Sequence, residues 1–345
     1  MNRLRILRPD DWHLHLRDGA ALQAVVGFTA QRFGRAIVMP NLKPPITTTA
    51  LAQAYRQRIL SALPAGSRFE PLLTLYLTHS TTPDEIDRAR ACGFIHGVKL
   101  YPAGATTHSD AGVSDIERVY GVLAHMEKVG MRLLIHGEST RPDVDVFDRE
   151  THFIDTVLEP LLARFPKLPM VLEHLSTARS VDFIRGARPG IAATITPQHL
   201  LHNRNAIFSG GIRPHLYCLP ILKREPDREA LVEAATSGNP RFFLGTDSAP
   251  HEKNAKENAC GCAGIFTAHA AIELYAEAFA SVGRLDRLEA FASHFGADFY
   301  GLPRNTDHIT LLNEPSMVPA GYLFGDGELI PYRAGETVGW RLESA

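Results

Sequence analysis

The chain has little cysteine, and its cysteines are not arranged for a disulfide framework or a zinc knuckle. Four occur among 345 residues, and the two nearest, Cys260 and Cys262, have one residue between them. That spacing is tighter than the usual zinc-binding pair, and no second pair follows. We therefore expect Cys92, Cys218, Cys260 and Cys262 to be free thiols in a reducing compartment.

Long apolar runs and basic runs are also missing. No window is long and apolar enough to span a bilayer, and the arginines of the first ten residues are not followed by the apolar core of a secretory signal. The 36 basic and 38 acidic residues leave a net charge of −2, which disfavours nucleic acid as a partner. We expect a cytoplasmic protein with a small-molecule partner, bound to neither membrane nor nucleic acid.

What the chain does contain is a regular alternation of apolar strands and helices. Eight short apolar runs follow one another at about 30 residues each, the length of a strand-helix-strand unit. This pattern indicates an α/β fold, a (β/α)8 TIM barrel in a single domain over 1–345. A doubly wound open sheet is the alternative, but no Gly-x-Gly-x-x-Gly turn is present. The predicted strands are 11–18, 36–41, 71–77, 97–101, 132–136, 170–174, 191–196 and 241–247.

Helices are predicted between these strands and beyond the last one. A long loop of Gly, Thr and Ser at 102–112 is a candidate lid. After the barrel we expect a helical and irregular C-terminal extension, with helices at 264–280 and 285–300 and a Pro/Gly-rich tail. The other predicted helices are 20–33, 49–62, 83–92, one from 114, 148–164, 177–185 and 227–236.

The first strand carries the motif His13-Leu14-His15. Alternate side chains of an extended strand share a face, so His13 and His15 should point the same way, with Arg17 next on that face. Two imidazoles at this spacing can close on one metal ion. The ordinary alternative is the polar face of an amphipathic strand.

Other polar residues lie inside or at the ends of later apolar strands. They are Lys99 in the fourth strand, His136 and His174 at the ends of the fifth and sixth, and Asp247 at the end of the eighth. Each alone has an ordinary explanation, such as a hydrogen-bonded core histidine, a snorkelling lysine or a turn aspartate. Because the carboxyl ends of barrel strands meet at one rim, all six together favour a metal centre.

The lysine requires a chemical explanation, since an ammonium is repelled by cations. A neutral lysine amine can take up CO2 to give a carbamate, the N6-carboxylysine form of Lys99, whose two oxygens can bridge two metals. His13, His15 and Asp247 would then bind one ion, and His136 and His174 the other. Imidazole and oxygen ligands suit zinc best, with manganese or cobalt as substitutes. A hydroxide shared by two such metals is a nucleophile at neutral pH.

This ligand pattern resembles that of the amidohydrolase superfamily over the whole predicted barrel. Six runs narrow the resemblance to the dihydroorotase family of the short bacterial type. They are Arg-Pro-Asp-Asp-Trp-His-Leu-His-Leu-Arg-Asp-Gly (8–19), Met-Pro-Asn (39–41), Val-Lys-Leu-Tyr-Pro-Ala-Gly-Ala-Thr-Thr (98–107), Ile-His-Gly-Glu (135–138), Leu-Glu-His-Leu-Ser (172–176) and Gly-Thr-Asp-Ser-Ala-Pro-His (245–251).

The resemblance implies the reversible cyclisation of N-carbamoyl-L-aspartate to L-dihydroorotate in pyrimidine biosynthesis, two zinc ions per subunit and a homodimer. Asp247 would be the catalytic general acid and base, taking the proton of the metal-bridging hydroxide and passing it to the leaving nitrogen. Seven residues would bind substrate. Arg17, Asn41 and His251 would bind the α-carboxylate, and further substrate contacts would come from Leu219, Ala263, Thr106 and Thr107.

Two alternatives stay open at this point. Another cyclic amidohydrolase, such as a hydantoinase or allantoinase, would share the metal ligands, although those proteins usually carry a long segment ahead of the barrel. A non-catalytic scaffold relative would have lost ligands, whereas all six are present here. From the residues alone, Arg17 supports an anionic substrate, because its forked donors match a carboxylate; a surface salt bridge is its ordinary alternative.

Overall fold

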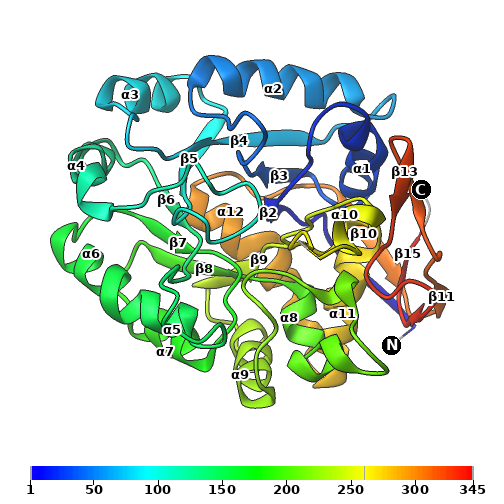
Figure 1. Cartoon of the computed structure of the whole chain (residues 1–345). Helices are drawn as coiled ribbons and strands as arrows, with labels where there is room; N and C mark the ends of the chain where they lie inside the picture. The colour runs from blue at the N-terminus through cyan, green and yellow to red at the C-terminus, as the bar shows by residue number, and fades with distance from the viewer. Residues whose placement is uncertain (1, 260, 344–345) are drawn as a thin grey trace.

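Eight parallel strands form a barrel in the computed structural model, which describes residues 2–259 and 261–343. Figure 1 looks into this barrel, with helices arranged in a ring around it. The strands neighbour one another in chain order. They are β2 (Asp11–Leu14), β3 (Arg35–Val38), β4 (Glu70–Tyr76), β5 (Ile95–Leu100), β6 (Leu133–Ile135), β7 (Met170–Leu172), β8 (Ile191–Ile195) and β9 (Phe242–Leu244).

The first and last barrel strands meet just beyond their carboxyl ends. The backbone N–H of Asp247 donates to the carbonyl of His13 at 2.8 Å, and that of His15 donates to the carbonyl of Ser248 at 2.9 Å. A parallel bridge joins Leu14 to Ser248. The predicted TIM barrel is therefore confirmed, and its closure brings the His-x-His motif beside the last strand.

Helices cover the outside of the barrel, and several begin where the sequence supplies a capping side chain. Asp18, Thr48, Thr82 and Thr177 each accept a hydrogen bond from a backbone N–H of the first turn. The helices are α1 (Gly19–Arg32), α2 (Thr49–Ala62), α3 (Pro83–Ala91), α4 (Tyr120–Val129), α5 (Arg149–Phe153), α6 (Glu159–Arg164), α7 (Ala178–Gly186), α8 (Pro197–Leu201), α9 (Glu225–Thr236), α10 (Lys253–Lys256), α11 (Ala271–Ser281) and α12 (Phe295–Tyr300).

Several predicted helices are divided in the structure. The helix predicted over 148–164 is α5 and α6 joined by a π-helical segment, η2 (Ile154–Leu158). The helix predicted over 264–280 starts only at η5 (Ala268–Ala270). Residues 261–267 are not helical, and Ile265 forms a parallel bridge with Ser248. The helix predicted over 285–300 consists of three segments in the structure, η6 (Leu285–Arg287), η7 (Ala290–His294) and α12. The remaining short helices are η1 (Ile116–Val119), η3 (Arg204–Phe208) and η4 (Pro214–Leu216).

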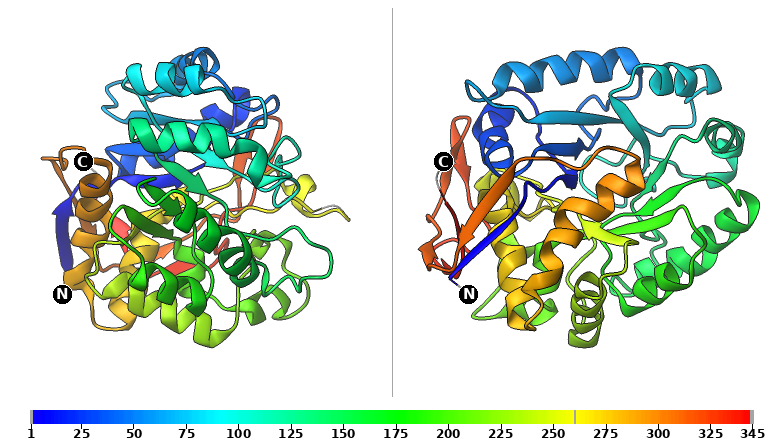
Figure 2. Two further views of the ribbon diagram at one scale, coloured as in Figure 1. Left: turned by 90° about the vertical axis from the view of Figure 1, so that its left-hand side faces the viewer. Right: turned by 180° about the vertical axis from the view of Figure 1, so that it is seen from behind.

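The C-terminal extension contains short antiparallel strands. One of them pairs with a strand that precedes the barrel, and this preceding strand was not among the predicted ones. This strand, β1 (Arg3–Leu7), pairs with β10 (His308–Leu312), which in turn pairs with β15 (Arg341–Leu342). The right-hand view of Figure 2 shows β1 lying along β10. The other short strands are β11 (Ser316–Met317), β12 (Tyr322–Phe324), β13 (Gly327–Leu329) and β14 (Thr337–Val338).

One end of the barrel is closed by α12. Its residues Ala297 and Tyr300 pack with interior barrel side chains such as Trp12 and Phe243 in one buried cluster. Arg132, just before β6, donates to the carbonyl of Tyr300 at 2.9 Å, so α12 sits at the amino-terminal end of the barrel, as the rear view of Figure 2 shows. The carboxyl-terminal end is left for the polar side chains.

The contact between α12 and the barrel gives a stability prediction at Gly296. A Cβ at this position would lie 2.0 Å from Nε1 of Trp12, whose indole is buried and stacked on Tyr300. We expect Gly296→Ala to reduce the free energy of unfolding by about 1–3 kcal/mol through overpacking. The measurement is urea unfolding. The control is Gly121→Ala on α4, where a Cβ meets nothing within 4 Å; equal losses in both variants would contradict the prediction.

Candidate metal centre

Three side chains from the joined ends of β2 and β9 form a potential metal site. The ligand atoms of His13, His15 and Asp247 all lie within 4.8 Å of one another, and the three residues are buried. Oδ1 of Asp247 is 3.0 Å from Nε2 of His15 and 3.4 Å from Nε2 of His13. Gly245 permits this approach, because a Cβ there would lie 2.6 Å from Cβ of Thr194 and 3.1 Å from Cβ of His13.

The two later histidines lie beside this group. The His174 ring centroid is 4.9 Å from that of His13 and 4.8 Å from that of His136. His136 directly follows β6, His174 follows β7 after one residue, and both are buried. The backbone of His174 and that of Asp247 have positive φ values of 44° and 45°, a costly conformation for non-glycine residues that is often found at functional sites.

Burial and neighbouring charges set the protonation of these groups. Burial lowers the pKa of His15 to about 4 and that of His174 well below its usual range, so both rings are neutral. Burial acts to raise the pKa of Asp247, but hydrogen bonds from His13 and His15 prevail and hold it well below its usual range. Burial acts to lower the pKa of His13, but the charge of Glu173 and the hydrogen bonds to Asp247 and Glu173 together raise it. These surroundings favour a cation beside His13.

Lys99 is fully buried in β5, and its Nζ lacks a hydrogen-bond partner among the described residues. The Nζ lies 5.0 Å from the centroid of the Tyr101 ring. Burial lowers the pKa of Lys99 to about 8, opposed by the charges of Glu173 and Asp247. A buried ammonium without an acceptor is costly, and the lowered pKa leaves a larger neutral fraction of this amine near pH 7 than an exposed lysine has; the neutral amine is the form that can react with CO2.

Three of the candidate ligand histidines each have a second polar group against the ring. Oε2 of Glu173 is 2.9 Å from Nδ1 of His13, Oδ1 of Asn41 is 2.7 Å from Nδ1 of His15, and Oε2 of Glu138 is 2.8 Å from Nε2 of His136. Such partners set the tautomer and orientation of metal-binding histidines.

The prediction of site residues did not include Glu173 and Glu138, although both stand in quoted motifs. A further carboxylate behind the site, Asp11, accepts from Thr246 Oγ1 at 2.6 Å and from the backbone N–H of His13 at 3.1 Å. Burial raises its pKa to about 7. The signal that points to Glu173 and Glu138 is the same one that pointed to Lys99 and Asp247, a charged residue within or shortly after an apolar strand.

Arg17 reaches the site by a different route from the one predicted. Strand β2 ends at Leu14, and Arg17 has a φ of 60°, so the prediction that His13, His15 and Arg17 follow one strand face is wrong. The turn instead directs the guanidinium towards the last barrel strand. Its Nε donates to the carbonyl of Pro250 at 2.9 Å, and Nη2 lies 2.9 Å from Nε2 of His251.

The candidate substrate-binding residues border a narrow cavity beside the histidines. The loop over 102–112 lies against it, where Thr107 Oγ1 is 3.1 Å from the backbone N of Ala263 and the Asn41 amide donates to the Thr107 carbonyl at 3.3 Å. Lys99 does not border the cavity, and His251 is placed by its contacts to Arg17 and Ala263. The lining residues are His13, His15, Arg17, Asn41, Tyr101, Thr106, Thr107, His136, His174, Leu219, Asp247, Ala249, Ala263 and Gly264.

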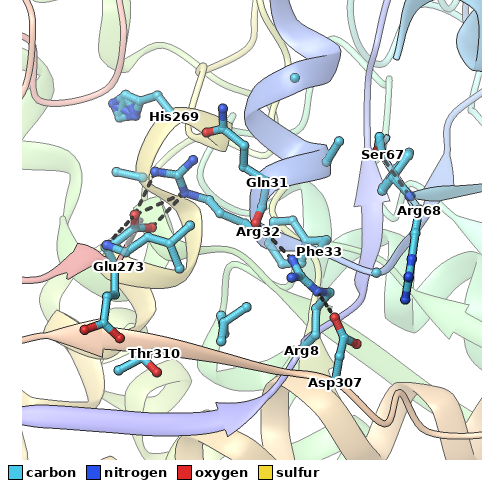
Figure 3. A pocket seen from close by; sticks show the side chains of 18 of the residues that line it. Arg8, Gln31, Arg32, Phe33, Ser67, Arg68, His269, Glu273, Asp307 and Thr310 are labelled. Carbon is cyan, nitrogen blue, oxygen red and sulfur yellow. Dashed lines mark hydrogen bonds and ion pairs between the residues drawn. The ribbon is translucent and has the colours of Figure 1, made fainter. Parts of the chain in front are cut away.

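A larger hollow of about 1500 Å³ lies at the amino ends of β3 and β4, against the C-terminal strands. Figure 3 shows ion pairs among its lining side chains. Arg32 forms an ion pair with Glu273, and Arg8 forms one with Asp307. Of the described residues, only His13, His15 and Asp247 bring three such ligand atoms within 4.8 Å, so the carboxyl end of the barrel is the candidate site.

A barrel with a possible metal-binding cluster at its carboxyl rim is typical of one class of hydrolases, and sequence comparison agrees. The sequence model of the amidohydrolase family matches residues 10–318, and the chain belongs to this family. None of the helices in the described part of the chain has the length and apolarity to cross a bilayer.

Comparison with individual proteins narrows the class. A curated protein named dihydroorotase from Alkalilimnicola ehrlichii is 62% identical over 342 residues, covering 99% of this chain and 100% of the relative. The crystal structure of dihydroorotase from Campylobacter jejuni superposes with a TM-score of 0.91 at 35% identity, covering 99% and 98% of the two chains. The crystal structure of dihydroorotase from Saccharomyces cerevisiae, in complex with 5-fluoroorotic acid, superposes with a TM-score of 0.91 at 31% identity and covers 100% of both chains. Within the family, this chain is thus a cyclic amidohydrolase of the dihydroorotase type.

Proposed function

We propose that the chain catalyses the reversible cyclisation of N-carbamoyl-L-aspartate to L-dihydroorotate in pyrimidine biosynthesis, with two zinc ions per subunit. The observation that carries this proposal is that one cavity is lined both by candidate metal ligands and by a cationic side chain suited to a carboxylate. A cluster of buried histidines with Asp247 and the side chain of Arg17 both line this cavity. A cyclic amide bearing a carboxylate would engage both at once.

The residues present fit the implied metals. His13, His15 and Asp247 would hold one ion, His136 and His174 the other, and carbamylated Lys99 would bridge them; the buried Nζ of Lys99 without an acceptor supports this role. When bound, a pair of divalent cations supplies a nucleophile from water at neutral pH and polarises the amide carbonyl.

Asp247 is proposed to move the proton. Its lowered pKa keeps the carboxylate ionised, so it can accept a proton at Oδ1 or Oδ2 during hydrolysis. For the same reason the protonated form is a strong acid, which readily gives the proton to the leaving ring nitrogen. In the biosynthetic direction it would take a proton from the carbamoyl nitrogen.

The α-carboxylate is proposed to bind Arg17, Asn41 and His251. Burial and the charge of Arg17 lower the pKa of His251, so its ring is neutral and offers one N–H. The relative from Saccharomyces cerevisiae was solved with 5-fluoroorotic acid, which also carries a carboxyl group. Leu219 and Ala263 would contact the rest of the ring, and Thr106 and Thr107 would cover it from the loop.

We propose further that residues 1–345 act as a single domain of a cytoplasmic homodimer. The pairing of β1 with β10 ties the two ends of the described chain together, which supports one domain. Cys92, Cys218 and Cys262 are free thiols, as expected in a reducing compartment; Cys260 lies outside the described residues.

The proposal is tested by a dihydroorotate hydrolysis assay on the purified protein before and after chelation. We expect turnover to fall to background after metal removal and to return with added zinc, because the nucleophile depends on the metals. Hydantoin and allantoin are offered in parallel. Faster turnover of either would favour another cyclic amidohydrolase, and a metal-loaded protein inactive on all three would favour a scaffold.

A further inference from the structure

Lys256 is a buried lysine outside the proposed metal and substrate ligands. It ends the short helix α10 and is 4% exposed, although lysine is almost never buried without partners. Its Nζ donates to three backbone carbonyls, those of Tyr217 at 3.0 Å, Cys262 at 2.9 Å and Gly264 at 2.6 Å. All three protons of the ammonium are therefore used.

The three carbonyls belong to two loops that border the cavity. Tyr217 precedes Leu219, and Cys262 and Gly264 stand on either side of Ala263; both Leu219 and Ala263 line the cavity. The backbone N–H of Gly264 also donates to the Tyr217 carbonyl at 3.0 Å. Lys256 thus joins the loop of Leu219 to the loop of Ala263 at a point where they already touch.

The effect of these bonds is greatest at the peptide groups of Ala263. With the carbonyls of both its neighbours taken by Lys256, the N–H of Ala263 faces Thr107 Oγ1 at 3.1 Å, and its carbonyl lies 3.0 Å from Nε2 of His251. The loop is packed tightly here. A Cβ on Gly264 would lie 2.6 Å from the Ala249 carbonyl oxygen and 2.9 Å from Cδ2 of His251, so a shift of this loop would displace His251 as well.

We propose that Lys256 is a positioning residue for substrate binding, whose ammonium holds the Leu219 and Ala263 loops in the geometry that the substrate meets. This inference rests on the proposed function. Lys256 touches neither the candidate metal ligands nor the cavity, so it acts through the backbone of Ala263 and through His251. Its loss should weaken binding of the substrate in the ground state and the transition state alike.

The test compares Lys256→Met, which keeps the aliphatic stem and removes the ammonium, with Lys253→Met on the same helix. Lys253 has a side chain 41% exposed and reaches only Glu328 in a surface ion pair. We expect Lys256→Met to raise KM for dihydroorotate about tenfold while kcat changes less than about threefold, the signature of lost uniform binding. Metal content should match the wild type, and Lys253→Met should behave as the wild type.

A KM within about twofold of the wild type, or a fall in kcat at constant KM, would overturn the inference. If Lys256→Met does not fold, Lys256→Gln takes its place; its amide can donate to at most two carbonyls, and we expect a smaller rise in KM. A wild-type protein that leaves dihydroorotate intact refutes the proposed function instead. Amide hydrogen exchange then decides the inference separately: Ala263 and Gly264 should exchange faster in Lys256→Met than in Lys253→Met, and equal exchange contradicts it.

Discussion

Replacing Lys99 with methionine is expected to reduce dihydroorotate turnover by more than about a hundredfold, beyond the 10- to 100-fold that residues supporting metal ligands typically cost. Methionine keeps the volume of the side chain and is compatible with a fully buried position, so packing in β5 should survive. What is lost is the amine that would carry the carbamate. The measurements are kcat, metal content and thermal stability on the same preparation.

The Lys99→Met variant distinguishes between two roles of Lys99, that of a metal ligand and that of a side chain that only fills space. If Lys99 only fills space among Tyr101 and the histidines, Lys99→Met should retain activity, and could even be more stable, because a buried amine without an acceptor has been removed. A stable, metal-replete and active Lys99→Met protein would remove the bridging role. Lys128→Ala on the exposed surface of α4 is the control for the loss of a lysine.

Asp247→Asn is expected to lower kcat by about 10²–10⁴-fold, the range for a general acid and base. The asparagine amide has the shape of the carboxylate but does not take up a proton near neutral pH. It also weakens the contacts to His13 and His15, so metal content must be measured with the rate. If saturating zinc restores the activity of Asp247→Asn, the role of Asp247 is limited to metal binding, which contradicts its proposed role in proton transfer. Asp286→Asn, with a side chain 65% exposed, is the matched control.

The barrel could be predicted from the sequence because its strands are buried on both faces. Strand β9 is apolar throughout, β4 is buried from Pro71 to Tyr76, and several helices begin at their own capping residues. The same logic identified the candidate metal ligands, since a polar residue at the end of an apolar strand has few other reasons to be there. His13, His15 and Asp247 were predicted as ligands from positions far apart in the chain, and the barrel brings them together.

Features that depend on a distant partner or on a local backbone choice could not be predicted in this way. Strand β1 is stabilised by β10, about 300 residues later; its Arg-Leu-Arg-Ile-Leu run alternates polar and apolar residues, but it is short and its partner is distant in the chain. The placement of Arg17 depends on a positive φ that no residue type there announces. Lys256 stands in a polar stretch where burial of a lysine is unexpected, so its three carbonyl contacts emerge only from the folded loops.

The late partner of β1 has a consequence for synthesis on the ribosome. Every barrel strand is translated after β1 and before β10, so the edge of β1 stays uncovered during most of elongation. An exposed strand edge invites pairing with another nascent chain, and charged side chains oppose this. Arg3 and Arg5 point outward from β1 in the finished protein; on the growing polypeptide, the same two charges would keep neighbouring copies on a polysome from adding to its edge.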